Sequence, residues 1–293
     1  MRRFAIAGLQ LVLTKKDNLQ QLAEEVRLLK ARLPWVQMVV LGELSAYGPG
    51  LENAEPQGGR AEGAFCDIAR RHGIWLVPGS YYEREGEHVF NVAPVIDPNG
   101  QVIARYRKMY PFAPYEAGVA SGNAFCVFDV PGVARFGVSI CYDMWFPETT
   151  RALAWMGAEA VIHPTMTNTI DRDAELAIAR ASAAQNQLYF IDVNVAGRLG
   201  FGRSCAYGPG GEILHAAGSG HEPFALELDF EHVRLARQRG WNGIGQVLKS
   251  FRDTPIDYPQ YRPGARNSQT LERLGPLERP PEFPTASDAE DRT

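Results

Sequence analysis

Residues 134–148, ARFGVSICYDMWFPE, pass from an apolar run through a cysteine to a proline. The first seven of these residues have the composition of a buried strand. Pro147 stands where the first position of a helix would be, and Gly157 is placed to end that helix. We therefore expect Cys141 in a strand-to-helix turn, a setting that can expose a nucleophile and aim backbone N–H groups at developing negative charge.

Strand-like and helix-like segments alternate on both sides of this stretch. Helical spacing of apolar residues predicts helices at residues 18–33, 61–72 and 172–185, and a last helix from Glu231 to about Gln238. Strands are predicted for the alternating N-terminal run and for residues 36–41, 74–79, 89–96, 101–106, 160–163, 188–195, 204–207, 213–215 and 224–228. This order indicates an α/β fold, and by itself it allows either an open sheet or a barrel.

Two more reactive residues follow apolar, strand-like runs. Glu43 lies in LGELSAYG and Lys108 in RYRKMYP. A cysteine is nucleophilic only as the thiolate, so a catalytic cysteine needs a base to take its proton and a cation to steady the charge. Glu43 and Lys108 supply these chemical types. Taken singly, each has a plainer interpretation: Cys141 as a buried core cysteine, Glu43 as a solvated acid and Lys108 as an exposed cation.

The order Glu43, Lys108, Cys141 with these local motifs resembles the nitrilase superfamily of carbon–nitrogen hydrolases, over roughly residues 4–250. The resemblance implies a four-layer α-β-β-α sandwich. It also implies that Glu43 is the general base, that Cys141 forms a thioester, and that Lys108 with the Tyr142 backbone N–H holds the oxyanion. No cofactor or metal is then needed.

The segment KMYPFAPYEAG resembles the K-x-x-P-x-x-P-x-E stretch of the aliphatic amidase and formamidase branch. In that branch a second glutamate shares the active site, which implies a role for Glu116 in positioning the amide or moving protons. The plainer interpretation of Glu116 is an exposed loop acid. The chain departs from the branch at Leu44 and Tyr142, where tyrosine and aspartate are usual, and these departures bear on the substrate.

The residues after Cys141 also bear on the substrate. True nitrilases typically have C-W-E, whereas this chain has C-Y-D, as in many amidases and carbamoylases. Met144 and Trp145 stand where some carbamoyl amino acid hydrolases have arginines. We expect a substrate pocket formed by Tyr142, Trp145, Phe112 and Tyr115, and a small neutral primary carboxamide as substrate. An N-carbamoyl amine or amino acid, a nitrile, acyl transfer and a non-enzymatic scaffold stay open as alternatives.

Composition sets the remaining expectations. With 293 residues, 45% of them hydrophobic, the chain has enough material for one large domain, and we place it at residues 1–253 with a Pro-rich extension at 254–293. A net charge of −4 argues against nucleic acid as a partner. The four cysteines form no C-x-x-C pair, and the six histidines lack metal-ligand spacing. No run is long enough to span a membrane, so we expect a cytoplasmic protein.

The resemblance also implies self-association. Members of the family commonly dimerise through helices that follow the nucleophile. We therefore expect a homodimer or larger homo-oligomer, with residues 148–156 and 172–185 as the candidate surfaces.

Overall fold

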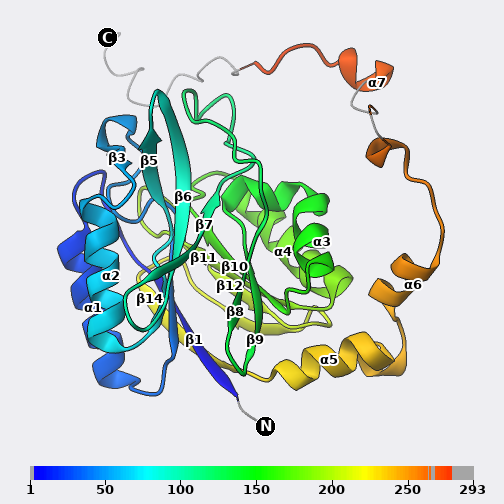
Figure 1. Ribbon diagram of the computed structural model, residues 1–293, viewed down its shortest axis with the longest axis horizontal. Helices are drawn as coiled ribbons and strands as arrows, with labels where there is room; N and C mark the ends of the chain where they lie inside the picture. The colour runs from blue at the N-terminus through cyan, green and yellow to red at the C-terminus, as the bar shows by residue number, and fades with distance from the viewer. Residues whose placement is uncertain (1–2, 263, 265–267, 279–293) are drawn as a thin grey trace, which may run out of the picture. The chain divides into compact units, whose positions relative to one another are not determined.

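The computed structural model describes residues 3–262, 264 and 268–278. Two compact units are present: Met1–Pro111 with Gly118–Thr254, and Phe112–Ala117 with Pro255–Thr293. The first unit contains both β-sheets and the helices that cover them (Figure 1). Within the described residues, no helix is both long and apolar enough to cross a membrane.

One sheet has eight strands and mixes parallel and antiparallel pairs. Its parallel centre is β1, β2 and β4, and β14 pairs antiparallel with β1 at the edge. The strands, in spatial order, are β14 (Glu222–Leu228), β1 (Phe4–Gln10), β2 (Met38–Leu41), β4 (Trp75–Val77), β6 (His88–Ile96), β5 (Tyr81–Glu85) and β3 (Glu55–Pro56), with β7 (Val102–Arg107) also paired to β6.

The other sheet has six strands, again with a parallel centre, here formed by β9, β10 and β11. The remaining strands pair antiparallel at its two sides. In spatial order the strands are β13 (Ile213–Ala216), β12 (Cys205–Tyr207), β11 (Tyr189–Asn194), β10 (Ala160–Thr165), β9 (Ala134–Val138) and β8 (Cys126–Val130).

The helices of the first unit are α1 (Leu19–Arg32), α2 (Arg60–His72), α3 (Pro147–Trp155), α4 (Arg172–Asn186), α5 (Phe230–Arg239) and α6 (Val247–Asp253), with short 3-10 turns η1 (Leu51–Asn53), η2 (Cys141–Trp145) and η3 (Trp241–Gly243). Pro147 is the first residue of α3, as expected for a residue whose missing N–H costs nothing there. The second unit contains η4 (Pro259–Tyr261) and α7 (Gln269–Glu272).

Alternation along the central strands divides the core into layers. In β1, Phe4 and Ile6 join a core between the two sheets, whereas Ala7 and Leu9 pack with residues of α1 and α2. In β11, Ile191 faces the shared core and its neighbour Phe190 packs with residues of α3 and α4. Successive side chains of a strand point to opposite faces, so this pattern fixes four layers. Figure 1 shows the two helix pairs on the outer sides. The expected α-β-β-α sandwich is confirmed, and the barrel alternative is excluded by two separate sheets.

Most of the expected elements are present within a residue or two of their expected ends. One expectation was wrong: the helix near 231–238 is not the last, because α6 and α7 follow it. Three strands of the observed sheets, β3, β5 and β8, have no counterpart among the predicted elements. The sequence of β5, YYERE, is charged and lacks the apolar pattern that predicts a strand. In the structure Glu83 is nevertheless buried, because it pairs with Arg105 and Arg107 of β7.

Candidate active site

Cys141 opens the turn η2, just after the chain leaves β9. The Ser139 N–H donates to the carbonyl of Ile162 at 3.2 Å, so this backbone still follows β10 two residues before the cysteine. Cys141 itself has φ of 46°, in the left-handed region that non-glycine residues seldom occupy. Such a conformation costs about 1–3 kcal/mol and persists only where surrounding contacts fix it. The expected strand-to-helix turn is therefore present, with η2 inserted before α3.

Asp143 supplies those contacts, and nothing in the sequence singles it out for this role. Its carboxylate accepts hydrogen bonds from the Ile140 N–H at 2.8 Å, the Tyr106 hydroxyl at 2.7 Å and the Tyr110 N–H at 2.9 Å. Burial raises the pKa of Asp143 to about 6, although these three hydrogen bonds oppose the rise. The carboxylate thus ties the cysteine turn to the chain on both sides of Lys108.

Lys108 and Glu43 form a buried ion pair. The Lys108 Nζ lies 2.8 Å from Glu43 Oε1, and 1% and 4% of the two side chains are exposed. The Asn91 amide also donates to Glu43 Oε1, at 2.8 Å. Both residues were expected at strand ends, and the structure brings them together from β2 and β7, 65 positions apart in sequence. The interpretations of Glu43 as a solvated acid and Lys108 as an exposed cation are excluded.

The backbone at Glu43 is fixed from both sheets. The Glu43 N–H donates to the carbonyl of Thr165 at the end of β10, at 3.1 Å. Leu44 has φ of 49°, a second left-handed non-glycine residue, and its N–H donates to the Ser80 hydroxyl at 3.0 Å. Strained backbone of this kind clusters at functional sites, where the surrounding structure over-determines it. Of the five non-glycine residues with positive φ in the part of the chain that the structure describes, Leu44 and Cys141 lie at or beside a predicted catalytic residue, whereas Gln187, Arg203 and Asn242 do not.

The electrostatics keep Cys141 protonated at rest. Only 8% of the residue is exposed, and burial raises the pKa of its thiol well above the ordinary value. The charge of Glu43 raises it further, the charge of Lys108 lowers it, and the charge of Glu175 raises it again. A neutral thiol beside a buried carboxylate needs that carboxylate as base before it can attack, which is the pairing that nucleophilic catalysis requires.

Two further polar residues lie near Cys141 and were not predicted. The Cys141 Sγ is 3.7 Å from Thr167 Oγ1, and Thr167 donates to Glu175 Oε1 at 2.9 Å. Glu175 lies in the first turn of α4, where an acid is usually explained by the helix dipole. Sequence offers no sign that this acid points inward.

The predicted pocket residues of η2 contact other aromatic rings. Tyr142 is half-buried, with its ring 5.4 Å from that of Phe146 in an edge-on arrangement and 6.3 Å from that of Trp145. Trp145 is partly buried against the apolar cluster that α3 and α4 share with the second sheet. Phe146 in turn stacks on Tyr110 with ring centroids 3.5 Å apart. The aromatic rings of the turn and of Phe146 thus pack against one another and, through Phe146, against Tyr110.

Glu116, Phe112 and Tyr115 belong to the second compact unit. Within it, the Phe112 N–H donates to Glu116 Oε2 at 2.6 Å, and the Glu116 N–H donates to the Phe112 carbonyl at 2.9 Å. The rings of Phe112 and Tyr115 stack at 4.9 Å. The segment is therefore internally organised, and the catalytic role of Glu116 stays a prediction.

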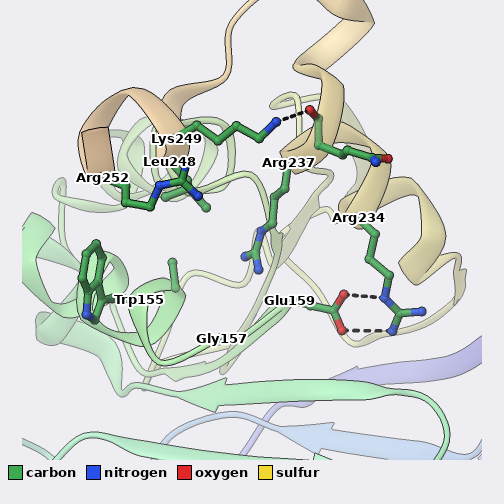
Figure 2. A pocket seen from close by; sticks show the side chains of 10 residues that line it. Trp155, Gly157, Glu159, Arg234, Arg237, Leu248, Lys249 and Arg252 are labelled. Carbon is green, nitrogen blue, oxygen red and sulfur yellow. Dashed lines mark hydrogen bonds and ion pairs between the residues drawn. The ribbon is translucent and has the colours of Figure 1, made fainter. Parts of the chain in front are cut away.

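A cavity of about 640 Å³ lies apart from these residues, among α3, α5 and α6 (Figure 2). Its cations already have partners: Arg234 bonds twice to Glu159, Lys249 donates to the Gln238 carbonyl, and Arg237 donates to the carbonyls of Ala158 and Gln187. None of the predicted site residues lines it. We do not assign the reaction to this cavity. In the part of the chain that the structure describes, no three His, Cys, Asp or Glu side chains are grouped to hold a metal ion.

Three proteins similar to this chain, two found by sequence and one by structure, are named as amidases. Omega-amidase NIT2 of Homo sapiens is 28% identical over 256 residues, covering 81% of this chain and 92% of its own. The formamidase of Helicobacter acinonychis is 29% identical over 215 residues, covering 66% and 63%. Among solved structures, a mutant of the amidase from Nesterenkonia sp. AN1, with acrylamide added to its active-site cysteine, superposes with a TM-score of 0.72. It is 25% identical and covers 80% of this chain and 97% of its own.

The family assignment rests on the greater part of the chain. The sequence model described as carbon-nitrogen hydrolase matches residues 3–238, which include Glu43, Lys108 and Cys141. The resemblance to the nitrilase superfamily is thereby confirmed. The chain belongs to the carbon-nitrogen hydrolase family, and it is an enzyme that hydrolyses carbon–nitrogen bonds.

Proposed function

We propose that this protein is an amidase that converts a small neutral primary carboxamide to its carboxylic acid and ammonia through a thioester on Cys141. The observation that carries the proposal is the buried Lys108–Glu43 pair, whose two charges both act on the thiol of Cys141. A base and a cation held at the same thiol are what acyl transfer to sulfur requires.

In the first half-reaction Glu43 takes the proton from Cys141, and the thiolate attacks the amide carbonyl carbon. The negative charge that develops on the carbonyl oxygen is held by Lys108 and the Tyr142 backbone N–H. Glu43 then returns its proton to the nitrogen as the carbon–nitrogen bond breaks, so ammonia leaves and the acyl group stays on sulfur.

In the second half-reaction Glu43 acts as the base again. It takes a proton from water, the hydroxide adds to the thioester carbonyl, and the carbon–sulfur bond breaks to give the carboxylic acid. The released thiolate is protonated, which restores the resting site. Within the same proposal, Glu116 positions the amide or assists proton transfer in this step, as the resemblance implies.

The choice of a small neutral amide rests on the residues around the turn. Met144 and Trp145 replace the arginines that would pair with a substrate carboxylate, and both pack in an apolar cluster. Tyr142 and Trp145 give the turn after Cys141 an apolar, aromatic character, and the assignment of Phe112 and Tyr115 to the substrate pocket stays a prediction from the sequence. The names of the relatives, an omega-amidase and a formamidase, support an amide rather than a nitrile.

The test is ammonia release from formamide, acetamide, propionamide, benzamide, N-carbamoyl amines and the matching nitriles. C141A should lose activity, whereas C66A, which removes a half-buried thiol on α2, should keep it. Turnover of simple amides that C141A abolishes is the expected result. Release of both carbon dioxide and ammonia from carbamoyl compounds alone would instead indicate a carbamoylase. A rate that rises with added amine or hydroxylamine would indicate acyl transfer.

We also propose a cytoplasmic homo-oligomer. Trp155 and Met156, at the end of α3, are 65% and 39% exposed, which supports self-association through the helices that follow the nucleophile. Sedimentation velocity of the wild-type chain beside a W155E variant tests this: the wild type should sediment as a dimer or larger, and the variant should shift toward monomer.

A further inference from the structure

A buried polar chain leads from Cys141 to helix α4, and the proposed mechanism does not use it. Cys141 Sγ lies 3.7 Å from Thr167 Oγ1, which lies 2.9 Å from Glu175 Oε1. Thr167 and Glu175 are 7% and 3% exposed. Polar groups buried this deeply are costly unless their hydrogen bonds define one arrangement, so the chain has a defined geometry.

The position of the Thr167 hydroxyl is fixed through its backbone. The Thr167 N–H donates to Asn194 Oδ1 at 2.9 Å, and the Asn194 amide donates back to the Thr167 carbonyl at 3.1 Å. Asn194 is fully buried at the end of β11. This pair of hydrogen bonds between one side-chain amide and the backbone of one residue sets where Thr167 stands relative to the cysteine.

Glu175 shares one cation with another acid. Arg172 Nη1 donates to Glu175 at 3.0 Å, while Arg172 Nη2 donates to Asp192 of β11. All three side chains are almost wholly buried. Burial raises the pKa of Glu175, the charge of Asp192 adds to the rise, and Arg172 opposes it.

The charge on Glu175 decides which way the Thr167 hydroxyl points. Thr167 has a single hydroxyl proton, and an ionised carboxylate can only accept it. When that proton is donated to Glu175, the Thr167 oxygen presents a lone pair to Cys141 and accepts the S–H proton. The hydroxyl then cannot donate to a thiolate at the same time.

We propose that Glu175, acting through Thr167, is a positioning residue that keeps the resting Cys141 protonated, with its S–H directed at Thr167. The inference rests on the proposed function of Cys141 as the nucleophile. The charged groups that face the thiol are Glu43 at the end of β2, Lys108 after β7 and Glu175 on α4. Glu175 itself is faced by Arg172 from its own helix and Asp192 from β11. The proton still leaves for Glu43 when substrate is attacked.

The test measures Cys141 directly, without turnover. Alkylation by iodoacetamide is followed from pH 7 to 11.5, because the pKa of Cys141 lies well above the ordinary thiol value. The Cys141 peptide is quantified by mass spectrometry, which separates it from the other three thiols. E175Q removes the carboxylate charge, and E175D keeps the charge but withdraws it from Thr167. Both should move the alkylation midpoint down by about one pH unit, since the hydroxyl becomes free to donate to the thiolate. At pH 7 the rate should rise only about threefold, because a less basic thiolate is a weaker nucleophile.

Two comparisons separate the hydrogen-bond path from a general effect of charge. D173N removes an acid from the same helix that is 79% exposed and paired with Arg203, and it should leave the profile unchanged. In a T167V background the E175Q shift should fall by more than half, whereas T167S should preserve it. Thermal unfolding of each variant checks that it is folded.

An unchanged midpoint in folded E175Q would overturn the inference. So would an E175D profile that matches wild type, or an E175Q shift that persists fully in the T167V background, because both would indicate charge acting through space. If E175Q does not fold, the alkylation midpoints of E175D and of the double variant T167V/E175D are compared in the same way. Failure of the amide panel with a shifted alkylation profile would refute the proposed substrate and leave this inference standing.

Discussion

Lys108 and Glu43 form an ion pair that is buried, with 1% and 4% of their side chains exposed. Breaking such a pair from one side leaves a buried charge without its partner, which typically costs about 3–5 kcal/mol. We therefore expect K108M to abolish activity and also to lower the free energy of unfolding by about that amount at pH 7. Because a lone buried carboxylate escapes the cost by binding a proton, the loss should shrink as pH falls.

The double variant E43Q/K108M is the matched control. It removes both charges together, and replacement of a buried pair by neutral groups is often close to neutral for stability. We expect it to unfold near the wild-type urea midpoint while remaining inactive. Equal destabilisation of K108M and the double variant would contradict the assignment of the cost to the loss of the Lys108 charge beside an ionised Glu43.

Asp143 gives a pH dependence of stability with a definite sign. Its pKa is about 6 in the folded protein and 3.8 as the ordinary value, so the folded state binds the proton more tightly. Stability from this group is present below pH 3.8 and is lost as pH rises through about 6. The shift corresponds to about 3 kcal/mol. We measure the free energy of unfolding of wild type and D143N with urea from pH 4 to 7. The wild-type value minus the D143N value should fall by up to this amount as pH rises.

D143N should also be less stable at every pH in that range. Asp143 Oδ2 accepts from the Ile140 N–H and the Tyr106 hydroxyl, and Oδ1 accepts from the Tyr110 N–H, so an NH₂ group in place of either oxygen leaves at least one of these donors without its acceptor. Curves that run parallel across the whole range would show that Asp143 does not titrate as described.

Sequence predicted the reactive residues but not the residues that hold them. Glu43, Lys108 and Cys141 are visible because each follows an apolar run and each carries a distinctive chemistry. Asp143 and Thr167 act through contacts with residues more than 25 positions away, such as Tyr106 and Cys141. Their side chains are of ordinary types at ordinary places, so only the tertiary structure distinguishes them from a turn acid and a loop threonine.

At the scale of elements, Gly42, which follows β2, and Gly79, two residues after β4, approach too closely for a side chain on Gly79. A Cβ on Gly79 would lie 1.7 Å from the carbonyl oxygen of Gly42, and Gly79 has φ of +76°. We expect G79A to lower stability by well over the roughly 1–2 kcal/mol of a left-handed alanine. It should also reduce kcat, because the Gly42 carbonyl must move and Gly42 precedes Glu43.

G86A is the control for backbone strain alone. Gly86, in the β5–β6 hairpin, has φ of +60°, but a Cβ there meets nothing within 4 Å. It should cost about 1–2 kcal/mol and leave kcat unchanged. Urea unfolding and initial rates of the two variants would contradict the steric explanation if G79A and G86A behaved alike.

The elements that sequence predicted well are those buried on one or both faces. β2, β10 and β11 read as apolar runs, and α1 and α2 read as helical spacing, because burial alone determines those patterns. The sequence did not predict β5, because its buried Glu83 depends on arginines of β7. It did not predict α6, because none of the residues of that helix is buried. Choosing a sandwich over a barrel depended on the family resemblance, since strand order is not encoded in local periodicity.

At the scale of the whole molecule, the apolar core of the described residues lies entirely before the C-terminal extension. The four buried clusters end at Val233, and past Gly240 no described residue is buried. We predict that a chain ending at Thr254 unfolds cooperatively within about 3 °C of the full-length protein, because none of the described residues after Thr254 belongs to the core. This also tests the proposed division into residues 1–253 and an extension.

A chain ending at Gly240 is the informative comparison, because it also removes α6. That helix contacts its neighbours through Leu248, whose N–H donates to Gln187, and through Phe251, whose ring lies 5.9 Å from that of Trp155. Losing these contacts exposes apolar surface of α3 and α4, so its melting temperature should fall by about 4 °C or more below that of the chain ending at Thr254. Scanning calorimetry of the three chains measures both steps. A large loss already at Thr254 would mean that the extension stabilises the domain, and equal melting of both truncations would mean that α6 does not.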